Sequence, residues 1–154
     1  MKTITIITTT IQTKWATLIS ALIAFFTPVG GMLLAVGFSI LLDTITGVWK
    51  SRKQGKAITS RGLSQVISKM LLYQITIILF FLIDWYILNS ILKSIFNQDL
   101  LLTKVLSLVL ISIEVISINE NYKAVKGIDL WASLKKLISR AKELKNDSDE
   151  IGLK

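Results

Sequence analysis

The sequence contains no cysteine and no histidine. Disulfide bonds, thiolate nucleophiles, imidazole bases and Cys/His metal sites are therefore excluded. The remaining groups for catalysis are serine, aspartate, glutamate and lysine, and no pair on one expected helix forms a serine–lysine or aspartyl-protease-like motif. We therefore expect a protein that is not an enzyme and that needs no cofactor and no metal.

Charged residues are also scarce, at 18% of the 154 residues against 52% hydrophobic. The apolar residues are concentrated in blocks, whereas a soluble domain spreads them in short stripes. The block at 70–92 contains one charged residue, Asp84, and about 20 apolar residues are enough to span a bilayer. The pattern predicts an all-α integral membrane protein with about four transmembrane helices, at about 8–27, 31–49, 70–92 and 100–118.

The first of these spans is the weakest. Its apolar core, at 15–26, covers only about 18 Å as a helix, which is short of the roughly 30 Å hydrocarbon core. The segment crosses if the Thr/Ile-rich stretch before it continues the helix; otherwise it dips into the bilayer and returns. Both arrangements predict a tight bend between two helices at the Pro/Gly cluster, 28–31.

The segment 50–69 carries six basic residues and no acidic one. Such loops stay in the cytoplasm, beside anionic lipid headgroups, and with four crossings both termini would also be cytoplasmic. We expect membrane lipids rather than nucleic acid as the partner, because the basic patch adjoins spanning helices. The Thr59–Ser60 pair is a plausible helix N-cap. The headgroup and topology residues are Lys50, Arg52, Lys53, Lys56, Arg61 and Lys69.

The chain divides into a membrane domain, 1–122, and a cytoplasmic or interfacial tail, 123–154. The tail predicts an amphipathic helix, with Asp129 placed to cap its N-terminus and basic residues opposite the apolar face. This helix either lies on a membrane surface or packs on a partner subunit. Its apolar face consists of Leu130, Trp131, Leu134, Leu137, Ile138, Ala141 and Leu144.

Three of the expected spans each carry an acidic residue, Asp43, Asp84 or Glu114. An ionised carboxylate is costly in hydrocarbon, so each must face protein, water or the interface. By depth, the face of Asp43 and the face of Glu114 are expected to meet, whereas Asp84 has no evident partner and is expected to face a water-filled lumen. The polar candidates either fix helix packing or line a passage. They are Asp43, Thr46, Gly47, Asp84, Glu114, Ser117, Glu120 and Asn121.

Three short segments together resemble a known family. They are DTITGVW at 43–49, ITSRGL at 58–63 and EVISINEN at 114–121. They are similar to the phage holin family that includes the clostridial toxin-secretion holins, and most similar to variants in phages and prophages of Bacteroidetes-type hosts. The resemblance covers roughly 31–131.

The resemblance implies an inner-membrane protein that accumulates, assembles as a homo-oligomer into pores, and releases an endolysin that degrades the cell wall during host cell lysis. The long tail departs from many family members. It leaves open a non-lytic role, as an anti-holin, a toxin-export channel or a membrane anchor for a partner.

Overall fold

The computed structural model describes the backbone of residues 2–152 and the side chains of residues 14–145, and over this backbone it contains helices and no strand. The expected all-α class is therefore confirmed. The elements are α1 (Lys2–Lys53), α2 (Ser60–Ile83), a π-helical turn η1 (Asp84–Leu88), α3 (Asn89–Phe96), α4 (Leu101–Lys126) and α5 (Leu130–Gly152).

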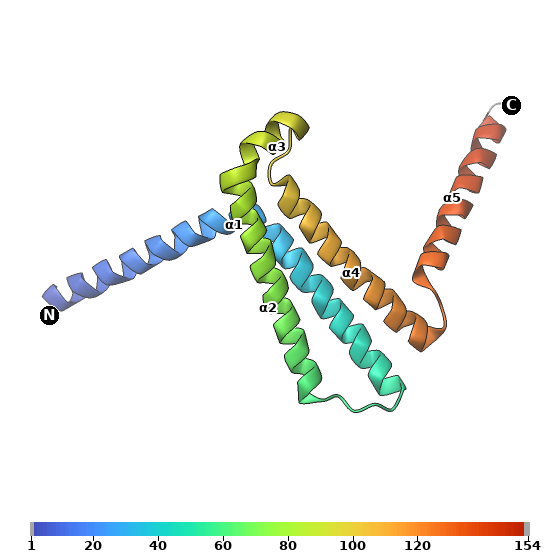
Figure 1. Ribbon diagram of the computed structural model, residues 1–154, viewed down its shortest axis with the longest axis horizontal. Helices are drawn as coiled ribbons and strands as arrows, with labels where there is room; N and C mark the ends of the chain where they lie inside the picture. The colour runs from blue at the N-terminus through green and yellow to red at the C-terminus, as the bar shows by residue number, and fades with distance from the viewer. Residues whose placement is uncertain (1, 153–154) are drawn as a thin grey trace.

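The C-terminal half of α1, α2 and α4 form the body of the molecule. They run side by side in Figure 1, where α1 packs mainly on α4 and α2 contacts both. Two buried serines, Ser39 and Ser107, donate to carbonyls of their own helices, so that helices approach closely without unpaired hydroxyls. The buried apolar core is small and consists of Val29, Val36, Ile40, Ile77, Phe81, Leu100 and Leu110.

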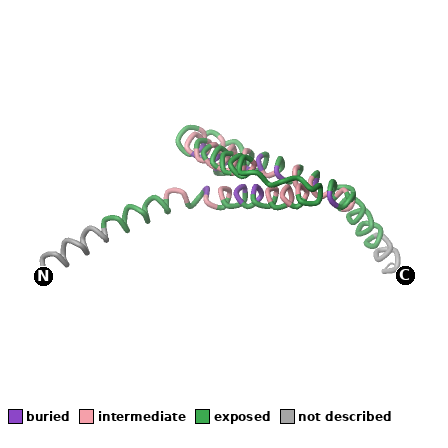
Figure 2. Tube along the Cα trace, turned by 90° about the horizontal axis from the view of Figure 1, so that it is seen from below, coloured by how far each residue is buried: buried purple, intermediate pink, exposed green. Residues whose placement is uncertain are grey.

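Three helical segments are long and apolar enough to cross a membrane: Lys14–Lys53, Ser60–Phe96 and Leu101–Lys126. Within their most apolar windows only 11%, 11% and 22% of the residues are buried. Figure 2 shows buried positions confined to the inner sides of the body. Because so much apolar surface is not tolerated in water, lipid or further protein must cover it. The membrane class is therefore confirmed.

The expected tight bend at 28–31 is wrong, because α1 continues through Pro28. The helix changes direction in this region instead (Figures 1 and 2). Proline kinks a helix because it lacks an N–H. A turn in lipid would leave more backbone groups unpaired than such a kink does, so the helix continues. The Thr27 hydroxyl donates to the Ile23 carbonyl at 2.8 Å, beside the interruption.

The spans expected at 8–27 and 31–49 lie within one long helix, α1. Among the described residues three segments are candidate spans, against the four expected, and the number of crossings stays a prediction. The part of that expected span at 8–13 lies outside the residues whose side chains are described.

The connection between α1 and α2 is shorter than the expected loop at 50–69. It comprises residues 54–59, with Lys50, Arg52 and Lys53 in the last turn of α1. The predicted N-cap is confirmed: Thr59 has extended backbone angles and its hydroxyl accepts from the Gly62 N–H at 3.3 Å. At the same end of the body, α4 runs to Lys126, past the boundary expected at 122.

Candidate functional site

A cluster of charged side chains lies where α1, α2 and α4 meet. The Lys69 ammonium on α2 lies 2.6 Å from a Glu114 carboxylate oxygen on α4 and 3.4 Å from a carboxylate oxygen of Asp43 on α1. The Glu114 side chain is fully buried, and those of Asp43 and Lys69 are 17% and 32% exposed. A carboxylate removed from water requires such a partner, so Lys69 joins the three helices through charge.

Asn121 on α4 extends this cluster toward the loop. Its amide nitrogen donates to Asp43 at 3.1 Å and to the Thr46 hydroxyl at 3.4 Å, and its oxygen accepts from the Lys50 ammonium at 3.1 Å. A β-carbon on Gly47 would lie 3.6 Å from the same amide nitrogen, which is ordinary van der Waals contact. The expected meeting of the Asp43 face with the Glu114 face is therefore what the structure shows.

The composition of the cluster limits its chemistry. Two carboxylates face one ammonium, and the second oxygen of Glu114 is buried without a hydrogen-bond donor among the described residues. Across the described part of the chain, no group of three or more acidic side chains could hold a metal ion. The arrangement can join helices, and it can expose polar groups to water if the helices separate.

Asp84 has a partner, contrary to the sequence expectation. Its side chain is fully buried, and one oxygen accepts from the Thr103 N–H at 2.9 Å and from the Thr103 hydroxyl at 3.0 Å. Leu100, the N-cap residue of α4, provides no side-chain cap, so Asp84 caps that helix from η1. The expectation that Asp84 faces a water-filled lumen is wrong for this arrangement, because protein surrounds the carboxylate.

The remaining residues that the sequence predicted, two polar candidates and the six headgroup residues, have different surroundings. Ser117 is half-buried and Glu120 is exposed, and neither makes a side-chain hydrogen bond or ion pair within the described region. Arg52, Lys56 and Arg61 are exposed at the loop end of the body. The others expected to face headgroups make internal contacts: Lys50 as above, Lys53 with the Val125 carbonyl and Lys69 with the two carboxylates.

Two further polar contacts between helices were not predicted from the sequence. Gln74 donates to the Leu33 carbonyl at 3.0 Å and so ties α2 to α1. Asn119, buried on α4, accepts from the Leu130 N–H at 2.8 Å, at the start of α5. A lone glutamine inside an apolar stretch is a signal that could have found the first contact, because a polar group in lipid needs a partner.

The predicted cap of the tail helix is confirmed. One Asp129 oxygen accepts from the N–H groups of Trp131 at 3.0 Å and Ala132 at 3.3 Å. A hydrogen bond from Lys123, followed by that from Ala132, lowers the pKa of Asp129 below its ordinary value. Beyond this cap α5 projects away from the body (Figure 1), and its apolar face is uncovered, with Trp131 51% and Leu137 63% exposed.

Comparison with known proteins gives one family. The model of the bacteriophage holin family matches residues 20–143, a range that includes the charged cluster and most of the three candidate spans. No curated protein and no solved structure matches the chain.

Proposed function

This chain belongs to the bacteriophage holin family, and we propose that it oligomerises in the inner membrane of a bacterial host and permeabilises it. In this proposal the lesion releases a cell-wall-degrading endolysin during phage lysis. The endolysin is a functional partner, and no contact with it is required. The protein acts without catalysis, through its assembly.

The charged cluster is the observation that carries this proposal. It brings Asp43, Lys69 and Glu114 together from three helices, and the Glu114 side chain is fully buried. A purely structural helix bundle can hold together with apolar and small residues alone. Charged groups inside the bundle can exchange their mutual contacts for water, so helices that separate within an oligomer would present a hydrated surface to a lesion.

The exposed apolar sides of the helices support assembly. In a single copy, only 11%, 11% and 22% of the residues in the most apolar windows of the three candidate spans are buried. Lipid covers such a surface when the protein is dilute, and other copies replace lipid as the protein accumulates.

The distribution of charge supports an orientation. We propose that the end of the body with Lys50, Lys53, Lys56 and Arg61 faces the cytoplasm, because loops rich in lysine and arginine remain there. α4 returns the chain to the same side, so α5 is also cytoplasmic. With three crossings instead of four, the N-terminus lies on the opposite side.

Expression in bacteria with a potential-sensitive dye tests the proposal. The wild type is expected to collapse the membrane potential after a lag, and Glu114→Gln is expected to change that lag because it weakens the contact with Lys69. Glu120→Gln is the matched control, since Glu120 is an exposed acidic residue of the same helix. Cells that keep their potential and growth rate while the wild type accumulates in the membrane would overturn the proposal.

A second function is favoured by α5. Its uncovered apolar face would suit a membrane anchor for a partner, or a brake on lysis as in an anti-holin. Deletion of residues 129–154 separates these roles. Loss of a bound partner with the lag unchanged supports the anchor, whereas a shortened lag supports the brake.

A further inference from the structure

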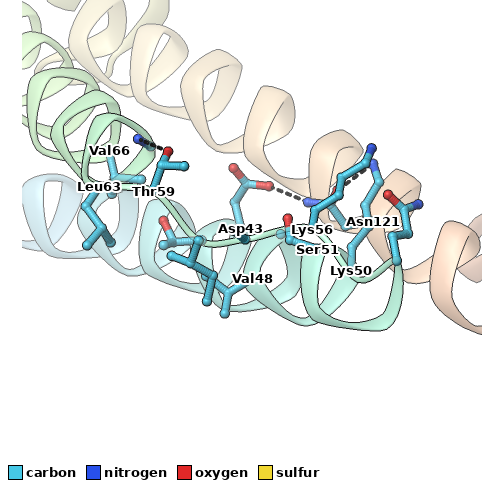
Figure 3. A pocket seen from close by; sticks show the side chains of 15 residues that line it. Asp43, Val48, Lys50, Ser51, Lys56, Thr59, Leu63, Val66 and Asn121 are labelled. Carbon is cyan, nitrogen blue, oxygen red and sulfur yellow. Dashed lines mark hydrogen bonds between the residues drawn. The ribbon is translucent and has the colours of Figure 1, made fainter.

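A pocket of about 390 Å³ lies at the basic end of the body. The last turns of α1, the connection at 54–59 and the first turns of α2 form its walls, and Asn121 of α4 closes one side (Figure 3). The pocket therefore lies where the candidate spans reach the proposed cytoplasmic face.

The lining of the pocket has two kinds of chemistry. One part presents ammonium and hydroxyl groups, from Lys50, Ser51, Lys56 and Thr59. The other part is apolar and is formed by Val48, Ala57, Ile58, Leu63 and Val66. A lining with both kinds of group suits an amphiphilic ligand.

The polar part of the lining favours an anion. Lys50 contacts the neutral amide of Asn121, and within the described residues Lys56 forms no ion pair. Asp43 is the acidic member of the lining, but both of its oxygens already accept hydrogen bonds, from Asn121 and from Lys69. The N-terminus of α2 adds partial positive charge, and its first turn contains no acidic residue.

We propose that this pocket binds the phosphate headgroup of an anionic phospholipid, with an acyl chain along the outer face of α2. The apolar wall continues out of the pocket, because Leu63, Ile67 and Leu71 are 51%, 61% and 58% exposed on a candidate span. A free phosphate would use the polar part of the pocket alone. A phospholipid uses both parts and covers apolar surface that the protein itself leaves open.

A bound lipid would act on the charged cluster through its neighbours. The pocket wall includes Asp43 and Asn121, which point toward each other and are joined by a hydrogen bond (Figure 3). The ligand would also connect α1 to α2 across the short loop. A lipid in the pocket is therefore expected to stabilise the packed arrangement of α1, α2 and α4. This expectation holds whether or not the protein lyses cells.

Native mass spectrometry of the full chain in a neutral detergent measures the stoichiometry and affinity of lipid binding. We expect one phosphatidylglycerol per chain, bound about tenfold more tightly than phosphatidylcholine, because the quaternary ammonium of phosphatidylcholine opposes the attraction of its phosphate to the lysines. Equal binding of the two lipids would overturn the proposal.

Two variants test the site itself. Lys56→Gln removes an exposed lysine of the lining and is expected to weaken phosphatidylglycerol binding about tenfold. Ala57→Trp fills the pocket while every charge is kept, and it is expected to weaken binding to a similar extent. Arg52→Gln is the matched control, since Arg52 lies in the same basic segment but outside the pocket lining, and its effect is expected to stay within about twofold.

The outcomes distinguish the alternatives. If Arg52→Gln weakens binding as much as Lys56→Gln, or if Ala57→Trp has no effect, lipid is attracted by diffuse charge and there is no site. If inorganic phosphate or glycerol phosphate displaces the lipid at equal concentration, the ligand is a soluble phosphate and the lipid assignment fails. Far-UV circular dichroism of each variant shows whether its helices are intact, and a loss of binding counts only for a variant whose spectrum is unchanged.

Discussion

At the scale of single residues, Lys69 joins the three helices of the body through its two ion pairs. Its ammonium is 2.6 Å from the fully buried Glu114 and 3.4 Å from Asp43. Lys69→Met would leave the two carboxylates without this cation. We expect unfolding free energy to fall by about 2 kcal/mol, less than the roughly 3–5 kcal/mol of a fully buried pair, because 32% of Lys69 is exposed. Denaturant titration in micelles, followed by circular dichroism, measures the loss.

Two companion variants control this prediction. Lys69→Arg keeps the cation and is expected to retain most of the stability. The neutral combination of Asp43→Asn, Lys69→Met and Glu114→Gln is expected to recover most of the loss, because removing every charge also removes the cost of burying them. Wild-type stability of Lys69→Met alone would show that the ion cluster does not hold the bundle together.

The sequence predicted part of this cluster for a physical reason. A charge in an apolar stretch must find a partner, so the matching depths of Asp43 and Glu114 indicated that their faces meet. Lys69 was not recognised as that partner because it follows five other basic residues and belongs by sequence to a cytoplasmic loop. The partner of Asp84 includes the backbone N–H of Thr103, and a backbone donor carries no sequence signature.

At the scale of helices, the start of α5 depends on the charge of one carboxylate. The pKa of Asp129 is lowered, chiefly by the hydrogen bond from Lys123, below its ordinary value of 3.8. A lowered folded-state pKa adds stability that is present above the unfolded-state pKa and is lost as the pH falls through the folded-state pKa. We therefore expect the helicity of α5 to stay constant from about pH 8 to 5 and to decrease below about pH 4.

Circular dichroism of the full chain between pH 8 and pH 2 measures this change. Asp129→Asn keeps an oxygen that can cap the helix but has no charge to lose, so its acid transition is expected to be smaller than that of the wild type. The difference between the two profiles isolates this residue from the other carboxylates of the tail. Superimposable profiles would contradict the prediction.

The sequence predicted the N-termini of two helices correctly, but it predicted a turn where α1 continues. The caps at Thr59 and Asp129 were predictable because a short polar side chain directly before an apolar, periodic run is the usual signal of a helix N-terminus. The Pro/Gly cluster at 28–31 indicated a turn, as it would in a soluble protein. The structure continues the helix through Pro28, because lipid offers no water to replace lost backbone hydrogen bonds.

At the scale of the whole molecule, one copy consists of a three-helix body from which two helical arms project. The arms are α5 and the part of α1 before the kink, and neither packs along the body (Figures 1 and 2). Apolar residues of the first arm are widely exposed, including Trp15 at 61% and Ile23 at 65%. Because both arms carry uncovered apolar surface, the molecule must complete its packing with lipid or with further copies.

The topology of this body gives a prediction that the absence of cysteine makes easy to test. Single cysteines at Thr3, Gly55, Phe96 and Glu150 sample the N-terminus, the basic loop, the opposite turn and the tail. With three crossings and the basic loop inside, a membrane-impermeant maleimide added to intact spheroplasts is expected to label positions 3 and 96 and to spare 55 and 150, which react only after the membrane is opened. The cysteine-free wild type is the control for background labelling.

Two outcomes would contradict this topology. Protection of position 3 alongside 55 would restore four crossings. Labelling of position 55 from outside would reverse the orientation and remove the cytoplasmic setting proposed for the lipid pocket.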